Sequence, residues 1–157
     1  MTLNDLTVNF THLNRAYLLS EWHWLIGVEK MPILLSASGD AFLQDSNDGS
    51  IMVLDTCNGK LTEIAGSFDQ FSSLLTNKDF LMEYLAVQLV EDLMKAGTKL
   101  SEGKIYSFKK LPVLGGELSP ENIDTVDIEV HFSMTGQIHQ QVQNLPDGTP
   151  TDNIVLN

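Results

Sequence analysis

The chain contains a single cysteine, Cys57, among its 157 residues. One cysteine excludes an intramolecular disulfide, so a reducing compartment is expected. The first ten residues have neither a basic region nor an apolar stretch, so we expect no secretory signal in them. No apolar run approaches the ~20 residues that a membrane-spanning helix needs. These absences predict a cytoplasmic protein with no membrane partner.

Basic residues are also scarce. Nine Lys and Arg stand against 21 Asp and Glu, which gives a net charge of -12. Contacts to phosphates require Lys and Arg, so direct binding to nucleic acid is not expected. From Leu111 to Asn157 there is no Lys or Arg, while seven acids give this part a charge of -7 and leave -5 for the first 110 residues. A segment whose Lys, Arg, Asp and Glu residues are all acidic favours a positively charged partner.

The length and the apolar content predict one folded domain over residues 1–157. Domains cluster at roughly 100–150 residues, and a chain of this size buries about 68–70% of its unfolded surface. Apolar residues make up 43% of the sequence, which argues against disorder despite the net charge.

The first half of the chain predicts a short helix followed by strands. Ser20 can cap a helix that ends at Gly27, and on that helix Trp22 and Trp24 would face different ways. Asp-Gly and Asn-Gly pairs then mark the tight turns of a three-stranded meander. The three strands of the meander are expected at Ala41–Gln44, Ile51–Leu54 and Leu61–Ala65, and a separate strand at Met31–Leu35 precedes them.

The second half predicts two helices and two further strands. Ser67 caps a helix through Leu75, and a longer helix runs from Asn77 to Ala96 with Gly97 as its end. A strand is expected at Ile105–Phe108. The alternation of apolar and polar residues predicts another strand over Thr125–Met134, and a short helix capped by Thr135 is expected over Gln137–Asn144. The fold class is therefore α+β, an antiparallel sheet of meander and C-terminal strands with helices packed to one side.

One segment superficially resembles a calcium-binding loop, the run D-S-N-D-G-S at Asp45–Ser50. An EF-hand loop needs Gly at its sixth position and Glu at its twelfth, where this chain has Ser50 and Thr56. A hairpin turn explains the run better.

No set of residues predicts a catalytic or metal site. His131 and His139 are eight residues apart, a spacing that matches no standard zinc pattern, and hydrogen-bonded histidines are the better interpretation. Cys57 lies in an Asn-Gly turn without the elbow signature of a nucleophile. A small hydrolase built on either histidine would require a concave pocket around it. We therefore expect a protein that is not an enzyme and has no cofactor or metal.

The acidic run near the C-terminus is the candidate binding site. A solvated, solubilising surface is the alternative explanation, but ordinary surfaces intersperse both signs of charge. We predict that the partner is bound by five residues of this run: Glu117, Glu121, Asp124, Asp127 and Glu129. Asp127 and Glu129 would share one face of the strand expected at Thr125–Met134.

Several short sequence motifs resemble those of a family of bacterial immunity proteins that accompany DNase effectors of the type VI secretion system. The resemblance covers most of the chain, and its C-terminal motifs are the most specific. The motifs are Trp22–Gly27 (W-H-W-L-I-G), Ser38–Asp45 (S-G-D-A-F-L-Q-D), Ile51–Leu61 (I-M-V-L-D-T-C-N-G-K-L), the helix Phe68–Leu75, Pro112–Glu117 (P-V-L-G-G-E), Val130–Val142 and Leu145–Thr149 (L-P-D-G-T). A looser part of this pattern is shared with the wider SUKH superfamily of immunity proteins.

The resemblance implies a cytoplasmic immunity protein that binds and neutralises a cognate toxin, a nuclease effector with a basic cleft. It implies no catalytic residues. Many members carry a further N-terminal domain that resembles the GAD domain of tRNA amidotransferases, for which this chain is too short. The alternative from another class is a regulatory or scaffolding module that binds a host protein or a small ligand.

Overall fold

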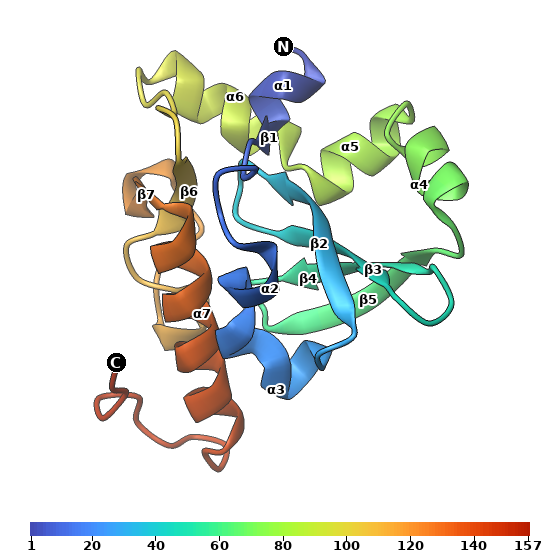
Figure 1. The fold of residues 1–157 in the computed structure, drawn as a ribbon. Coiled ribbons are helices and arrows are strands. Elements are labelled where there is room, and N and C mark those ends of the chain that lie inside the picture. Colours follow the sequence, from blue (N-terminus) through green and yellow to red (C-terminus); the bar gives the residue numbers. More distant parts are fainter.

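The computed structural model describes residues 1–157 and contains two antiparallel sheets surrounded by short helices (Figure 1). The five-stranded sheet has the order β1-β2-β3-β4-β5, and β6 and β7 pair with each other. The strands are β1 Thr7–Val8, β2 Lys30–Ser36, β3 Ala41–Asp45, β4 Ile51–Asp55, β5 Lys60–Ala65, β6 Lys104–Phe108 and β7 Ile123–Asp127. The helices are α1 Leu3–Leu6, α2 Arg15–Leu18, α3 His23–Ile26, α4 Phe68–Leu74, α5 Lys78–Tyr84, α6 Val87–Lys95 and α7 Ile128–Gln143. None of them is long and apolar enough to cross a membrane.

The predicted three-stranded meander, β3 to β5, is confirmed, and the separately predicted strand β2 pairs with β3 to extend it. Strands β2 to β5 follow one another in sequence and in space, each antiparallel to the last. The turns after β3 and β4 contain Gly49 and Gly59 with φ of 75° and 67°, the left-handed conformation that glycine adopts without strain. The Asp-Gly and Asn-Gly signals therefore mark these turns correctly.

The α+β class is confirmed, but the helices cover both faces of the main sheet rather than one. Successive residues of a strand point to opposite faces. Phe42 of β3 accordingly packs with Phe71 of α4 and Phe80 of α5, while Leu43 packs with Trp22 and with Phe132 of α7. The main sheet thus separates two hydrophobic cores, with α4–α6 on one and α7 on the other (Figure 1).

The C-terminal strands form their own two-stranded sheet instead of extending the meander. One backbone hydrogen bond joins the two sheets, from the N–H of Tyr106 to the carbonyl of Ala37 at 3.0 Å. Ile105 packs into the core that holds Trp22, and Tyr106 into the core that holds Phe42, so β6 closes one end of both cores.

The long helix predicted over Asn77–Ala96 is two helices. Ser67 and Asn77 cap α4 and α5 as expected, accepting from the backbone N–H groups of Gln70 and Phe80. The break lies at Ala86, which has φ 47° and ψ 49°, a left-handed conformation that no continuous α-helix contains. Residues on both sides of it, Leu85 and Val90, are fully buried in one core, so tertiary packing outweighs the helical propensity of this segment.

The strand predicted over Thr125–Met134 is wrong beyond Asp127, and the short helix predicted over Gln137–Asn144 is only the end of α7. The residues after Asp127 alternate between apolar and polar as in a strand, but they also fit the three-to-four-residue spacing of a helix face. Most buried residues follow one another at spacings of three and four along α7: Ile128, His131, Phe132, Thr135, Gly136, Ile138 and His139. Gln137, between two of them, is buried as well. Val130, which the alternation would bury, is 51% exposed. The helical period therefore describes the buried face, and it includes polar residues that a purely apolar pattern leaves out.

Trp22 and Trp24 do not face different ways; their rings stack, with centroids 5.7 Å apart and planes at 21°. Trp22 ends a 3-10 turn, Ser20–Trp22, and only His23–Ile26 is α-helical. The tighter turn changes the angle between the two side chains. Both indoles donate to α7, Trp22 to the Thr135 hydroxyl and Trp24 to the Gly136 carbonyl, each at 3.3 Å.

Candidate functional site

The five acidic residues proposed as the binding site are all exposed, but they lie on different elements. Glu117 lies in the loop after the 3-10 turn Pro112–Leu114, and Glu121 lies in the next turn, Pro120–Asn122. Asp124 and Asp127 are on β7, where a separation of three residues directs their side chains to opposite faces. Glu129 is in the first turn of α7, so it shares no strand face with Asp127.

Two lysines that precede the segment without Lys or Arg in sequence come close to it in space. Lys104 of β6 forms a 2.7 Å salt bridge with Asp127 across the β6–β7 ladder. Lys110 lines a shallow hollow together with Glu117 and Glu121. The charge of the acidic run is therefore partly balanced at three of its five members, which no count along the sequence can show.

Glu129 has a different environment. It lines a hollow between α2 and α7 together with Glu21 and Tyr17, and no Lys or Arg contributes to the lining. Tyr17 is 71% exposed. Tyrosine is enriched in protein interfaces, and carboxylates without a basic neighbour favour a positively charged partner. Sequence reasoning missed Glu21 and Tyr17, because they lie more than a hundred residues before Glu129 and no local pattern connects them.

His131 is buried and serves as a structural hydrogen-bonding residue at the centre of the fold. Its Nε2 lies 2.7 Å from the carbonyl oxygen of Gly39, so this nitrogen carries the proton and donates. Its Nδ1 then accepts from the hydroxyl of Ser107 at 2.7 Å. The Thr56 hydroxyl also donates to the Gly39 carbonyl, at 2.7 Å, and lies 3.2 Å from Nε2. One imidazole thus joins α7 to β6 and to two turns of the meander.

His139, two turns further along α7, repeats this arrangement. Its Nε2 donates to the carbonyl of Thr56 at 2.9 Å, and its ring packs against Trp22 with centroids 5.5 Å apart. Gly39 and Gly59 allow the two rings to approach, because a Cβ on either glycine would lie under 3.0 Å from an imidazole atom. The sequence motifs S-G-D, T-C-N-G and H-F-S-M-T-G-Q-I-H therefore meet in one packed cluster.

Ionisable groups near this cluster have shifted pKa values. Burial lowers the pKa of His131 to about 4 against the hydrogen bond to Gly39, so the ring is neutral at pH 7. Burial and then the nearby Asp55 raise the pKa of Asp40 to about 7, although Thr56 donates to its carboxylate. Burial, with Asp55 and Asp40, raises the pKa of the Cys57 thiol to about 11, which keeps it protonated and unreactive. No group of three or more His, Cys, Asp or Glu side chains could hold a metal ion.

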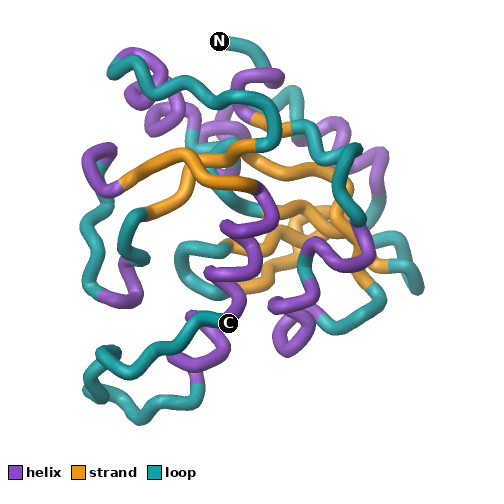
Figure 2. Tube along the Cα trace, turned by 60° about the vertical axis from the view of Figure 1, so that its left-hand side comes forward, coloured by secondary structure: helices purple, strands orange, loops and turns teal.

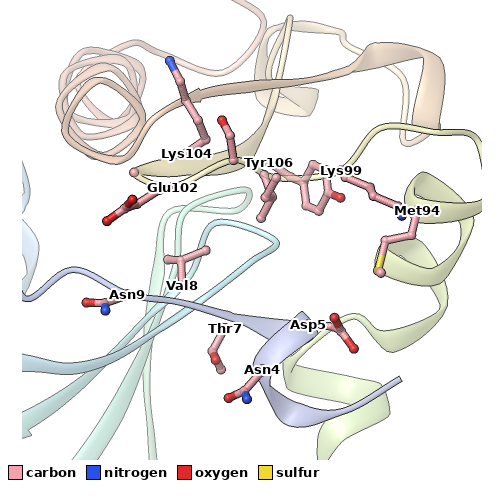
Figure 3. Close-up of a pocket in the computed structure, with 13 residues that line it drawn as sticks. Asn4, Asp5, Thr7, Val8, Asn9, Met94, Lys99, Glu102, Lys104 and Tyr106 are labelled. Atoms are coloured by element: carbon pink, nitrogen blue, oxygen red, sulfur yellow. The ribbon is translucent and has the colours of Figure 1, made fainter.

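A polar groove of about 310 Å³ lies between the N-terminal segment and the loop that leads into β6 (Figure 3). Asn4, Thr7 and Asn9 face Lys99 and Glu102 across it. Both signs of charge occur in its lining, and its Lys104 is the residue paired with Asp127. The groove therefore has neither the uniform charge of the hollow at Glu129 nor an arrangement that indicates catalysis.

Comparisons with known proteins agree with this fold. Residues 65–139 match the family model described as T6SS immunity protein Tdi1, C-terminal. The match ends at His139 and includes His131, two residues of the packed cluster. A solved structure, the crystal structure of Atu4351 from Agrobacterium tumefaciens, aligns with a TM-score of 0.57 and 20% identity over 80% of this chain.

At that identity the alignment with Atu4351 shows a shared fold only, and this chain spans 65% of the length of that one. The comparison with curated proteins found no match. The resemblance noted from the sequence motifs is confirmed by the family match. Over residues 65–139 the chain is similar to the C-terminal domain of the type VI secretion system immunity protein Tdi1.

Proposed function

We propose that this protein is a cytoplasmic immunity protein that binds a cognate type VI secretion toxin, a nuclease with a basic cleft, and neutralises it through acidic surface. The observation that carries the proposal is the family match over residues 65–139. The net charge of -12 supports a basic partner, since opposite charges raise association rates by about 10–10³-fold. The protein acts by occupying or distorting the toxin and not by catalysis.

Within the acidic surface, the hollow at Glu129 and Glu21 is the better docking position. Its carboxylates have no basic neighbour in the lining, whereas Asp127 is paired with Lys104, and Glu117 and Glu121 share their hollow with Lys110. A charge that is already paired gains less from a new partner than a free one. Glu117, Glu121, Asp124 and Asp127 then act at longer range, by steering.

The experiment that tests the proposal is a pull-down from lysate of the native organism, with the tagged full-length protein as bait and mass spectrometry as readout. We expect one basic partner with nuclease activity, whose recovery falls as salt rises. The purified partner should cut DNA, and adding the bait protein at equal concentration should stop the cleavage.

A partner that binds but has no nuclease activity would contradict the choice of toxin chemistry. Recovery of housekeeping proteins alone, independent of salt, would favour the regulatory or scaffolding alternative. A matched control bait carries Glu21→Lys and Glu129→Lys, which should recover much less of the same partner.

A further inference from the structure

The final residues of the chain run back along α7 and pair with two of its glutamines (Figure 2). The side chain of Gln141 accepts from the backbone N–H of Val155 at 2.9 Å and donates to the carbonyl of the same residue. The side chain of Gln137 accepts from the N–H of Asn157 at 2.6 Å and lies 3.5 Å from its backbone oxygen. Gln141 thus makes both hydrogen bonds that a neighbouring strand would make, while Gln137 makes one of them closely and also donates to the Ser133 hydroxyl at 3.0 Å.

The spacing of the two glutamines matches an extended backbone. Four residues of an α-helix rise ~6 Å, and two residues of a strand advance ~6.6 Å. Side chains four apart on one helix face can therefore pair with alternate residues of any extended segment. Going toward the start of α7, the same stripe continues with Ser133 and Glu129, so that it consists of Glu129, Ser133, Gln137 and Gln141.

Residues 155–157, called the tail below, are held by hydrogen bonds of their main chain and not by burial of their side chains. Val155 is 63% exposed and Leu156 is 47% exposed. A net contribution of roughly 0.5–1.5 kcal/mol for each hydrogen bond is small enough to be lost in competition with another segment.

The tail covers only half of the stripe. Next to Asn157 a hollow opens that is lined by Glu129, Val130, Ser133, Met134 and Gln137, with no basic residue. Val130 is half exposed in it, and Glu129 also lines the hollow that contains Glu21 and Tyr17. An extended segment longer than the tail would therefore gain apolar contact and an acidic site that the tail does not use.

We propose that the α7 stripe Glu129–Ser133–Gln137–Gln141 binds an extended, basic segment of the toxin, and that residues 155–157 occupy half of this site as a displaceable strap. The identity of the partner as a toxin rests on the proposed function; the binding of extended chain does not. In the register of the tail, the residue four positions beyond the one paired with Gln137 lies at Glu129, and a Lys or Arg there completes the fit.

The first experiment uses the full chain and a peptide probe. The double variant Val155→Pro, Asn157→Pro removes the two N–H donors of the strap, and Leu156→Pro is the matched control because its N–H pairs with neither glutamine. The probe is the sequence of residues 150–157 followed by Gly-Ser-Gly-Lys. We expect it to bind the double variant at least about tenfold more tightly than wild type or the control, because a closed strap lowers apparent affinity by the fraction of open molecules.

Two further variants of the opened protein test the contacts. Adding Gln137→Ala and Gln141→Ala should abolish peptide binding, whereas Gln140→Ala and Gln143→Ala, on exposed positions of the same helix, should leave it unchanged. A probe ending in Glu instead of Lys should bind about tenfold more weakly, and Glu129→Lys should reverse this order. Equal binding of the probe by wild type and the opened variant, or binding that survives the Gln137 and Gln141 substitutions, would overturn the proposal.

The second experiment uses the nuclease recovered by pull-down. Opening the strap should accelerate its association about tenfold, and Gln137→Ala with Gln141→Ala should weaken its binding by a similar factor. A nuclease that binds all these variants alike overturns its assignment to this face. If no toxin binds wild type, the proposed function fails, while the peptide titration still decides whether the stripe binds extended chain.

Discussion

The Nε2 of His131 and the carbonyl oxygen of Gly39 are 2.7 Å apart, and a Cβ on Gly39 would lie the same distance from that nitrogen. The two residues are 92 positions apart in sequence. The contact therefore requires both a neutral imidazole on α7 and a glycine in the turn after β2. This contact and the one between His139 and Gly59 hold α7 against two turns of the meander, the turn after β2 and the turn after β4.

His131→Ala should reduce the free energy of unfolding by about 3 kcal/mol, because it removes two buried hydrogen bonds and leaves a cavity. The Ser107 hydroxyl would lose its partner, and the Gly39 carbonyl would keep only Thr56. The measurement is urea unfolding at pH 7. His12→Ala, at an exposed position, is the control and should change stability by less than about 0.5 kcal/mol. Equal effects of the two substitutions would refute the structural role of His131.

Gly59→Ala should destabilise the protein more than Gly97→Ala. Both glycines have positive φ, 67° and 85°, so alanine costs about 1 kcal/mol of backbone strain at either position. Only at Gly59 does the new Cβ meet another group, 2.6 Å from Nδ1 of His139, whereas nothing lies within 4 Å at Gly97. Overpacking adds about 1–3 kcal/mol to the loss at Gly59. Thermal unfolding of the two variants side by side measures the difference, and identical midpoints would contradict the packing of His139 on this turn.

The pH dependence of stability should show two opposed contributions. The pKa of Asp40 is raised from 3.8 to about 7, so the folded protein holds this proton more tightly, and the resulting stability is present below pH 3.8 and lost as pH rises through about 7. The pKa of His131 is lowered from 6.5 to about 4, so its contribution is present above pH 6.5 and lost as pH falls through about 4. Between pH 4 and 6.5 the two therefore oppose each other.

Single substitutions should separate these contributions. Relative to wild type, Asp40→Asn should make the free energy of unfolding rise more steeply from pH 4 to 6.5, because the His131 contribution is then unopposed. His131→Ala should make it fall with pH over the same range. Urea unfolding at half-unit pH steps measures both slopes. A change of the same sign in both variants would contradict the opposed shifts.

The sequence predicted the meander well and α7 badly, for a physical reason. The meander is set by local chemistry: Asp48-Gly49 and Asn58-Gly59 determine the turns whatever surrounds them. The segment after Asp127 satisfies two periods at once, since Ile128 and Phe132 fit both an alternating strand and a helical stripe. Only the buried positions of His131, Thr135 and Gly136 decide between them, and their partners lie in distant parts of the chain.

The sequence indicated which acidic residues form the candidate site, but not which other side chains lie beside them on the surface. The five acidic residues of the run Glu117–Glu129 are all exposed, as their charge suggests. Lys104 and Lys110 approach it only because β6 pairs with β7 and the following loop folds back on itself, so its uncompensated part cannot be identified from sequence. Glu21 and Tyr17 join Glu129 for the same kind of reason, through contact of α2 with α7.

Reversing the two carboxylates at the α2–α7 hollow should therefore affect toxin binding more than reversing two others of the acidic run. Glu21→Lys with Glu129→Lys and Glu117→Lys with Glu121→Lys change the net charge by the same amount, so long-range steering falls equally in both. Only the first pair places new cations beside Tyr17, in a lining without basic residues. We expect it to raise the dissociation rate about tenfold or more, whereas the second pair should act mainly on the association rate and on its dependence on salt. Surface plasmon resonance at two salt concentrations separates the rates; a second pair that dissociates as fast as the first would place the interface on the acidic loop instead.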